Sequence, residues 1–184
     1  GQQLRPSQNV TSSYTYMEVY DNSIYLIGYD GNIVQFSTQD HAADLTPINR
    51  WGGVDRATTS IAEPWDIALA PDGSLFVADL KTGHIYRMVN NQIKQSWSLT
   101  EFGRSGGDQP MGLAFDREGK LLVATSGHYI QRFRYDVPQS TLVTDTIPLG
   151  GNGTELGMLA SPTALDLDND GNIFVVEPGN KRIQ

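Results

Sequence analysis

A short pattern of apolar and polar residues recurs along this chain and organises it. Its clearest copy spans residues 63–79, where two short runs rich in β-branched and aromatic residues flank Asp72 and Gly73. Asp-Gly between two such runs predicts a β-hairpin, because glycine readily adopts the positive φ that tight turns need. Two further copies, each with a proline before the first run and a glycine at the turn, occupy residues 109–124 and 161–176. A weaker copy over residues 16–27 lacks the proline.

The spacing of these hairpins indicates the architecture. Asn22, Gly73, Gly119 and Gly171 mark the four turns, at intervals of 51, 46 and 52 residues. Repeats of about 40–50 residues that each form a four-stranded sheet are typical of β-propellers, in which neighbouring sheets cover faces that no single sheet can bury. We therefore predict an all-β protein, a β-propeller of four-stranded antiparallel blades, with about four blades present and the last incomplete. The expected blades span about residues 14–51, 62–99, 108–149 and 160–184, after an N-terminal tail or closing strand over residues 1–13.

The later strands of each blade follow from shorter apolar runs. We expect them at residues 32–37 and 47–51, at 83–88 and 94–99, and at 128–133 and 144–149. The last repeat stops after its third strand. Helical periodicity is absent, and a single helical turn is expected only over residues 154–160. Tight packing near the axis favours small residues on the innermost strands, namely Ala68, Gly112, Ala114 and Ala164.

The last repeat carries a resemblance to a known family. Ser161-Pro162-Thr163-Ala164-Leu165, the turn with its strand Asp170-Gly171-Asn172-Ile173-Phe174-Val175-Val176, and Gly179-Asn180-Lys181-Arg182-Ile183-Gln184 resemble the NHL repeat. The family's arginine before the third-strand isoleucine is matched by Arg182, whereas His84 and Tyr129 stand at that position in the two preceding repeats. The resemblance implies a propeller that usually closes with six blades, which needs about 270 residues at this period.

Two arrangements are compatible with four repeats. The chain is either a piece of a larger propeller, which we favour, or it closes with four blades and residues 1–13 complete the last sheet. A fragment would leave sheet faces or edges open, and these would favour self-association. The resemblance also extends to bacterial propellers appended to membrane-embedded glycosyltransferases, and on that basis we favour an extracytoplasmic or secreted location.

The composition narrows the possible partners. The 184 residues carry a net charge of −8 at pH 7 and no basic cluster with interleaved aromatics, so we expect no nucleic-acid partner. No apolar stretch approaches the roughly 18 residues that a membrane span needs, so we expect no membrane insertion by this segment. The chain has no cysteine, which excludes disulfides, thiolate metal ligands and a cysteine nucleophile.

Candidate ligand-binding residues gather on one predicted face of the propeller. Loops that join second to third strands, and loops that join one blade to the next, share that face. Trp65 is either a ligand platform or a packing residue between blades, and Asp66 either lines the central channel or caps its own turn. The full candidate set is Trp65, Asp66, His84, Met111, His128, Tyr129 and Arg182.

Metal binding is the alternative chemistry for part of this face. His84 and His128 lie at similar points of adjacent blades, and NHL-type lyases that use zinc and calcium make a site there conceivable. A catalytic zinc site needs three protein ligands, however, and His41 lies in a different kind of loop. Asp168 and Asp170 are spaced as in a calcium loop, with Glu177 six residues after Gly171, but a hairpin turn explains these acids without a metal. We therefore expect no cofactor, with Ca²⁺ or Zn²⁺ as the alternative.

The leading hypothesis is a non-catalytic NHL-like propeller that binds a protein, peptide or glycan through its loop face. No Ser-His-Asp order, phosphate-binding loop or pair of catalytic carboxylates is recognisable, so no catalytic residue is assigned. The alternative is a metal-dependent lyase or a lactonase-type hydrolase with its site at the central channel, which similar six-bladed folds support. The fold alone does not decide between the two.

Overall fold

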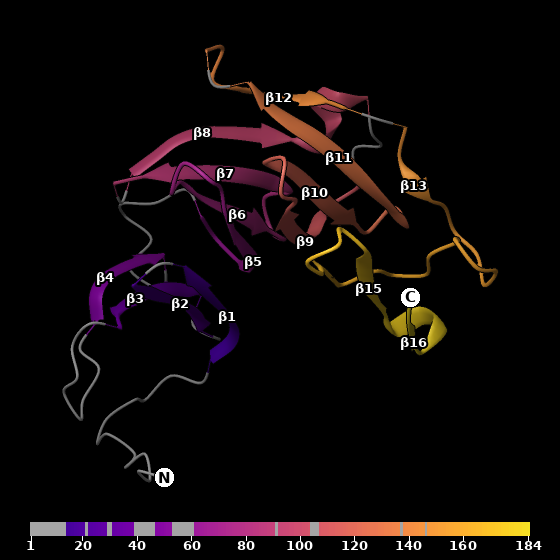
Figure 1. Cartoon of the computed structure of the whole chain (residues 1–184), viewed down its shortest axis with the longest axis horizontal. Coiled ribbons are helices and arrows are strands. Elements are labelled where there is room, and N and C mark those ends of the chain that lie inside the picture. The colour runs from indigo at the N-terminus through magenta and orange to yellow at the C-terminus, as the bar shows by residue number, and fades with distance from the viewer. Residues whose placement is uncertain are drawn as a thin grey trace, which may run out of the picture. The chain divides into compact units, whose positions relative to one another are not determined.

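The computed structural model describes residues 14–20, 22–28, 31–38, 47–52, 61–90, 92–103, 107–136, 138–145 and 147–184. These residues form antiparallel sheets and two short 3₁₀ helices, η1 (Leu99–Phe102) and η2 (Pro178–Asn180). The chain divides into two compact units, residues 1–62 and 63–184 (Figure 1). The predicted fold class is confirmed, because the described residues form four antiparallel sheets of the kind that make up β-propeller blades. The expected tail or closing strand, residues 1–13, lies outside the described residues, as does His41.

The first unit contains the first blade. Its strands follow one another as an antiparallel meander of β1 (Tyr14–Tyr20), β2 (Ser23–Gly28), β3 (Asn32–Ser37) and β4 (Pro47–Gly52). Ile33 and Val34 on β3 are almost completely buried, and Trp51 on β4 stacks on Tyr25 with ring centroids 6.2 Å apart. Strands β2, β3 and β4 therefore carry the apolar contacts of this sheet.

The second unit contains the other three blades. The second blade comprises β5 (Pro64–Leu69), β6 (Leu75–Asp79), β7 (His84–Val89) and β8 (Gln92–Ser98). The third comprises β9 (Pro110–Phe115), β10 (Lys120–Thr125), β11 (Tyr129–Asp136) and β12 (Thr141–Thr144), and β13 (Leu149–Gly150) also pairs with β11. The fourth comprises β14 (Ala164–Leu167), β15 (Ile173–Glu177) and β16 (Arg182–Ile183), so in the described part of the chain it has three strands.

The glycine turns have the same geometry in all three of these blades. The Gly73 N–H donates to the carbonyl of Ala70 at 2.8 Å, and the Ala70 N–H donates to the carbonyl of Ser74 at 2.9 Å. Gly73 has φ 79°, and nothing lies within 4 Å of a Cβ built there, so glycine is needed for its conformation and not for space. This is a type I turn followed by a left-handed residue, a common three-residue hairpin loop.

The turn also explains the acidic residue before the glycine. The Asp72 carboxylate accepts hydrogen bonds from the N–H and hydroxyl of Ser74 and pairs with Arg87 at 2.8 Å. Partial burial raises the pKa of Asp72, but the bonds from Ser74 and Arg87 outweigh this effect and hold the pKa below its usual value. Asp72 therefore stabilises the hairpin as an ionised side chain.

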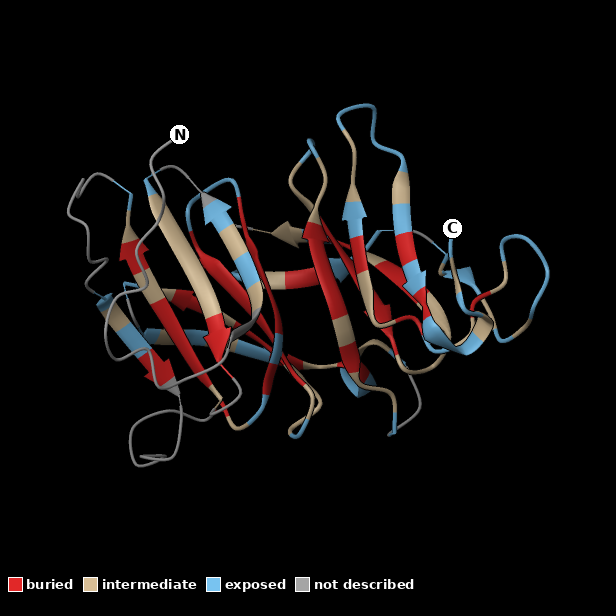
Figure 2. Ribbon diagram, turned by 90° about the horizontal axis from the view of Figure 1, so that it is seen from below, coloured by how far each residue is buried: buried red, intermediate tan, exposed pale blue. Residues whose placement is uncertain are grey.

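Neighbouring blades of the second unit pack face against face. The core between the second and third blades is aromatic, with Phe76 stacked on Trp97 and in edge contact with Phe115 and Tyr135. Figure 2 shows the buried residues following the inner strands of successive sheets. A Cβ added to Gly112 on β9 would lie 2.8 Å from the backbone nitrogen of Leu165 on β14. The innermost strands thus approach too closely for a larger residue, as the small residues there predict.

Two predicted elements are wrong. The fourth strand of the third blade is β12, not residues 144–149, because Pro148 cannot donate to a strand ladder and interrupts the run. The chain resumes as β13, which pairs with the opposite end of the long strand β11. Residues 154–160 form bends and turns instead of a helical turn, and the positive φ of 84° at Gly157 is incompatible with a helix.

Candidate functional site

Three blades share a buried polar position at the end of their second strand. These residues, all fully buried, are Asp79, Thr125 and Glu177. The Asp79 carboxylate accepts the N–H of Glu63 at 3.1 Å and that of Thr82 at 2.9 Å. In the third blade the next residue, Ser126, accepts the N–H of Gln109 at 2.9 Å through its hydroxyl. In each of these three blades, a side-chain acceptor at the end of the inner hairpin therefore binds a backbone N–H of the segment that enters the blade.

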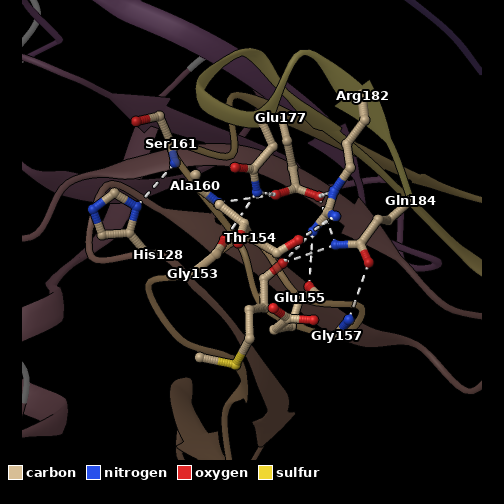
Figure 3. Close-up of polar contacts among 12 residues, drawn as sticks. His128, Gly153, Thr154, Glu155, Gly157, Ala160, Ser161, Glu177, Arg182 and Gln184 are labelled. Atoms are coloured by element: carbon tan, nitrogen blue, oxygen red, sulfur yellow. Dashed lines mark hydrogen bonds and ion pairs between the residues drawn. The ribbon is translucent and has the colours of Figure 1, made fainter.

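Glu177 has the richest set of partners at this position. Its carboxylate accepts the backbone N–H of Ala160 at 2.9 Å and side-chain donors from Asn180 at 2.9 Å, Arg182 at 3.0 Å and Gln184 at 2.6 Å. Burial raises the pKa of Glu177, but these four donors favour the ionised form more strongly and lower the pKa to about 2. The carboxylate is therefore an ionised centre of a hydrogen-bond network (Figure 3).

Arg182 extends this network to the loop between β13 and β14 (residues 151–163). Its guanidinium donates to three backbone carbonyls of that loop, those of Thr154, Glu155 and Met158, at 2.7, 2.9 and 2.8 Å. Gln184 adds two further contacts, because it donates to the Met158 carbonyl at 2.9 Å and accepts the Gly157 N–H at 3.0 Å. In Figure 3 the Glu177, Arg182 and Gln184 side chains converge on the backbone of the loop. Arg182 and Gln184 thus hold the loop against the fourth blade.

The loop is also braced by its own backbone. The Leu159 N–H donates to the Gly151 carbonyl at 2.8 Å, the Gly153 N–H donates to the Leu159 carbonyl at 3.2 Å, and the Gly151 N–H donates to the His128 carbonyl at 2.8 Å. Positive φ angles at several glycines, including Gly157, let the chain make this compact path. The loop is therefore an ordered surface element with its conformation fixed from two sides.

An apolar side chain projects from this ordered loop. Leu156 is 89% exposed, although the backbone on both sides of it is bound by Arg182 and Gln184. The network contacts the backbone around Leu156 and leaves its side chain in solvent. Because the backbone that carries Leu156 is already held in place, binding through this side chain costs little backbone entropy, which favours recognition by another molecule. The arrangement is suited to binding, with Leu156 as an exposed apolar side chain of the loop.

The predicted inner-strand residues Trp65 and Asp66 connect blades. The Trp65 indole N–H donates to the carbonyl of Thr163, which precedes β14, at 3.3 Å, while 40% of Trp65 stays exposed. Asp66 is 2% exposed, and its carboxylate accepts the N–H of Ile67 and the N–H of Leu113 on β9, both at 2.8 Å. Asp66 thus joins β5 to β9, a role that neither the channel nor the turn-cap interpretation included.

The predicted histidines each have a partner in the second unit. The Nδ1 of His84 lies 2.7 Å from the Thr82 carbonyl, and its ring stacks on Tyr86. The Nδ1 of His128 accepts the Ser161 N–H at 2.9 Å, which places any proton of the neutral ring on Nε2. His128 therefore binds the end of the β13–β14 loop. In the described part of the chain no three His, Asp or Glu side chains lie close enough together to hold a metal ion.

The remaining predicted residues are placed as follows. Tyr129 donates its hydroxyl to the Asp108 carboxylate at 2.7 Å, and Met111 lies half-buried on β9. Asp168 of the suggested calcium loop accepts the N–H groups of Asp170 and Asn172, as in a hairpin turn, while Glu177 belongs to the Arg182 network. Arg182 and His128 both contact the β13–β14 loop, Arg182 through the carbonyls of residues 154, 155 and 158 and His128 through the Ser161 N–H.

Sequence reasoning missed the loop itself and the residue that centres its network. Glu177 was considered as a calcium ligand and within a loop of the predicted binding face, Gln184 only as part of the repeat motif, and Leu156 not as a binding residue. Their common signal is an exposed leucine between glycines, followed after one β-hairpin by an acid, an arginine and a glutamine. The partners lie 24 to 28 residues apart, so only the folded chain reveals the contacts.

Comparisons with known proteins agree with the fold. No protein-family model and no curated protein matches the chain. Among solved structures, it is similar to virginiamycin B lyase from Staphylococcus aureus, with 15% identity and a TM-score of 0.63 over 97% of this chain and 56% of that one. It is similar to the WD40 repeats of RRP9, with 18% identity and a TM-score of 0.58 over 98% of this chain and 52% of that one.

A third similar structure is the extracellular domain of the putative hybrid two-component system BT3049 from B. thetaiotaomicron. The identity is 15% and the TM-score 0.62, over 95% of this chain and 22% of that one. The chain thus spans about half the length of the lyase and RRP9 chains. At these identities the likeness establishes a propeller fold. In the parts that the structure describes, no helix has the length and apolar character of a membrane span.

Proposed function

We propose that this chain is a non-catalytic binding module that recognises a protein or peptide through the loop face of its second unit. The β13–β14 loop carries the proposal, because Arg182 and Gln184 fix its backbone while Leu156 stays 89% exposed. Aliphatic anchors that enter a partner's pocket contribute much of the energy of many interfaces. The partner is therefore a protein or peptide with an apolar pocket of leucine size. A glycan, which offers no such pocket, is the less favoured ligand.

The ionisable groups of this face support binding over catalysis. Asp66, Glu177 and His128 each accept backbone N–H groups, and Glu177 is in addition fully buried. A general acid or base needs a free position within hydrogen-bond reach of substrate, and the Asp66 and Glu177 carboxylates and the Nδ1 of His128 are engaged in holding loops and strands. The chain has the same class of fold as the WD40 repeats of RRP9, and this similarity supports a binding role.

We also propose that the repeats are of NHL type. Arg182 supports this, because the arginine that matches the family's pattern forms the ion pair with Glu177 and binds the loop. The family's larger, six-bladed propellers fit a chain that spans about half of its structural neighbours. An extracytoplasmic location belongs to the same proposal and is supported by the likeness to an extracellular domain.

Selection from a phage-displayed random-peptide library tests the binding role. Peptides are selected on the wild-type protein and measured by calorimetry against Leu156→Asp and the matched control Val143→Asp, which alters an exposed apolar residue on β12. We expect Leu156→Asp to weaken binding at least about tenfold and Val143→Asp to leave it unchanged. Peptides that bind both variants equally, or a selection without enrichment, would contradict the proposal.

A metal analysis provides the second test. The protein is stripped with a chelator, reloaded with Zn²⁺ or Ca²⁺ and analysed for bound metal. We expect substoichiometric metal after gel filtration. One tightly bound ion per chain that is lost in a His84→Ala or His128→Ala variant would overturn the non-catalytic proposal and favour the lyase alternative.

A further inference from the structure

His128 binds both ends of the β13–β14 loop. Its backbone carbonyl accepts the N–H of Gly151, where the loop begins, at 2.8 Å. Its Nδ1 accepts the N–H of Ser161, near the end of the loop, at 2.9 Å (Figure 3). The residue has φ 68°, in the left-handed region that histidine adopts more readily than most residue types. One residue of the third blade thus closes the loop from which Leu156 projects.

Two adjacent N–H groups near the end of the loop are accepted by side chains of different blades. The Glu177 carboxylate of the fourth blade accepts the N–H of Ala160 at 2.9 Å, and His128 of the third blade accepts the next N–H, that of Ser161. Figure 3 shows Ala160 and Ser161 between the two acceptors. These two bonds attach the end of the loop to both blades.

The two acceptors respond differently to mild acid. The pKa of Glu177 is about 2, so its carboxylate stays ionised and continues to accept the Ala160 N–H well below neutral pH. A histidine side chain, in contrast, ordinarily gains a proton between about pH 8 and pH 5. Once Nδ1 carries a proton it cannot accept, and the Ser161 N–H would face another N–H. Mild acid therefore removes one of the two attachments and spares the other.

His84 makes the opposite kind of contact and provides a comparison. Its Nδ1 lies 2.7 Å from the carbonyl of Thr82, and a carbonyl only accepts, so this Nδ1 is the donor. Protonation of the remaining ring nitrogen leaves that bond in place. The bond of His128 to Ser161 depends on the neutral ring, whereas the bond of His84 to Thr82 does not.

The charged and titratable side chains around the His128 contact are engaged elsewhere or exposed. Asp108, in the segment before β9, accepts the Tyr129 hydroxyl at 2.7 Å. In the fourth blade Glu177 pairs with Arg182 at 3.0 Å, and the Glu155 side chain of the loop is exposed. In the described structure Nδ1 of His128 is the acceptor of the Ser161 N–H, so the contact depends on that nitrogen.

We propose that His128 is a positioning residue, whose protonation releases the end of the β13–β14 loop from the third blade and weakens binding by that loop. The inference rests on the proposed function, because it regulates the same loop. After the release the loop stays attached to the fourth blade through Glu177, Arg182 and Gln184. Its backbone gains freedom that binding must then restrict, which lowers affinity. The chain therefore binds its partner more tightly at neutral than at mildly acidic pH.

Amide hydrogen exchange measured by NMR on the wild-type protein tests the release. Protection of each amide is compared at about pH 8 and about pH 5, after correction for the intrinsic exchange rate. We expect protection of the Ser161 N–H to fall at least about fivefold, as for the loss of one hydrogen bond, while the Ala160 N–H stays protected. If Ser161 keeps its protection in acid, or if Ala160 is released together with it, the proposal is wrong.

His128→Asn separates the hydrogen bond from the proton. Asparagine also adopts the left-handed conformation readily, and its Oδ1, attached to Cγ as Nδ1 is, accepts a hydrogen bond without titrating. Ser161 should therefore keep its protection over the whole pH range in this variant. His84→Asn, the matched comparison, should retain the acid response of the wild type. An acid response that survives His128→Asn, or that disappears in His84→Asn, would assign the effect to another group and overturn the role of His128.

Calorimetry with the selected peptides tests the effect on binding. Acetylated peptides without histidine are used, so that titration of the ligand does not mimic the effect. We expect the affinity of the wild type to fall at least about threefold between about pH 8 and pH 5, and His128→Asn to abolish this fall. Release of Ser161 without a change in affinity would overturn the regulation of binding. A selection without enrichment counts against the proposed function, whereas the exchange of Ser161, measured without peptide, still decides the role of His128.

Discussion

The second strands of the second and fourth blades each end in a buried carboxylate that binds the segment entering the blade, but the two carboxylates differ in how many partners they bind. Asp79 accepts two backbone N–H groups, of Glu63 and Thr82, and completes a short local tie. Glu177, one methylene longer, accepts one backbone N–H and three side-chain donors. Through Arg182 these donors hold a loop that lies more than twenty residues away in sequence. A repeated structural position thus supports a surface loop in the fourth blade.

The largest expected effect comes from removing the carboxylate that differs most between the two blades. Glu177→Ala leaves the guanidinium of Arg182 and the amides of Asn180 and Gln184 without their buried acceptor. Breaking one side of a buried charged pair costs about 3–5 kcal/mol, and we expect a loss in that range in the free energy of unfolding, measured by urea titration. Glu155→Ala, which changes an exposed side chain of the same loop, should cost less than about 0.5 kcal/mol. Equal effects of the two substitutions would sink the comparison.

Acid should weaken the fourth blade through the same residue. The pKa of Glu177 is about 2 in the folded protein and 4.5 in the unfolded reference, so the folded state binds fewer protons. Its contribution to stability is therefore complete above about pH 5 and is lost as the pH falls from 4.5 towards 2. Urea titrations at several pH values should show this loss for the wild type and a flatter profile for Glu177→Gln over the same window. Identical profiles would contradict the assignment.

The smallest effect is expected at the corresponding tie of the third blade. Ser126→Ala removes the hydroxyl that accepts the N–H of Gln109, and no side-chain network depends on it in the described structure. The loss of one neutral hydrogen bond predicts about 1 kcal/mol of destabilisation, measured by urea titration. Ser126→Thr, which retains the hydroxyl, should recover most of it. If Ser126→Ala lowered the free energy of unfolding as much as Glu177→Ala, the hydrogen bond of Ser126 would not differ in importance from the network of Glu177.

Much of the fold could be predicted because its signals are local. Asp72-Gly73 and its counterparts at Gly119 and Gly171 place the hairpins, and their spacing indicates repeated sheets. The strand around Pro148 was misplaced, because β11 pairs with two separate segments that a linear pattern merges into one. Local periodicity therefore located the blades and misjudged one outer strand.

The candidate site was less predictable because its contacts are long-range. Arg182 was chosen for its resemblance to a repeat motif, but its partners Thr154 and Met158 have no pattern of their own. Asp66 stands where the other repeats have a small residue. Its carboxylate accepts the N–H of Leu113, 47 residues later, and no local turn rule describes that bond. Side chains that join blades become recognisable only when the register of the sheets is known.

Amide hydrogen exchange in the β13–β14 loop tests most directly whether the loop is held as a fixed binding surface. In the wild-type protein the N–H groups of Gly157 and Leu159 should exchange slowly, since Gln184 and the Gly151 carbonyl accept them. Arg182→Met should speed exchange at both at least about tenfold while the Phe76 amide on β6 stays protected. Fast exchange of these loop amides in the wild type, or equal protection after Arg182→Met, would contradict the account.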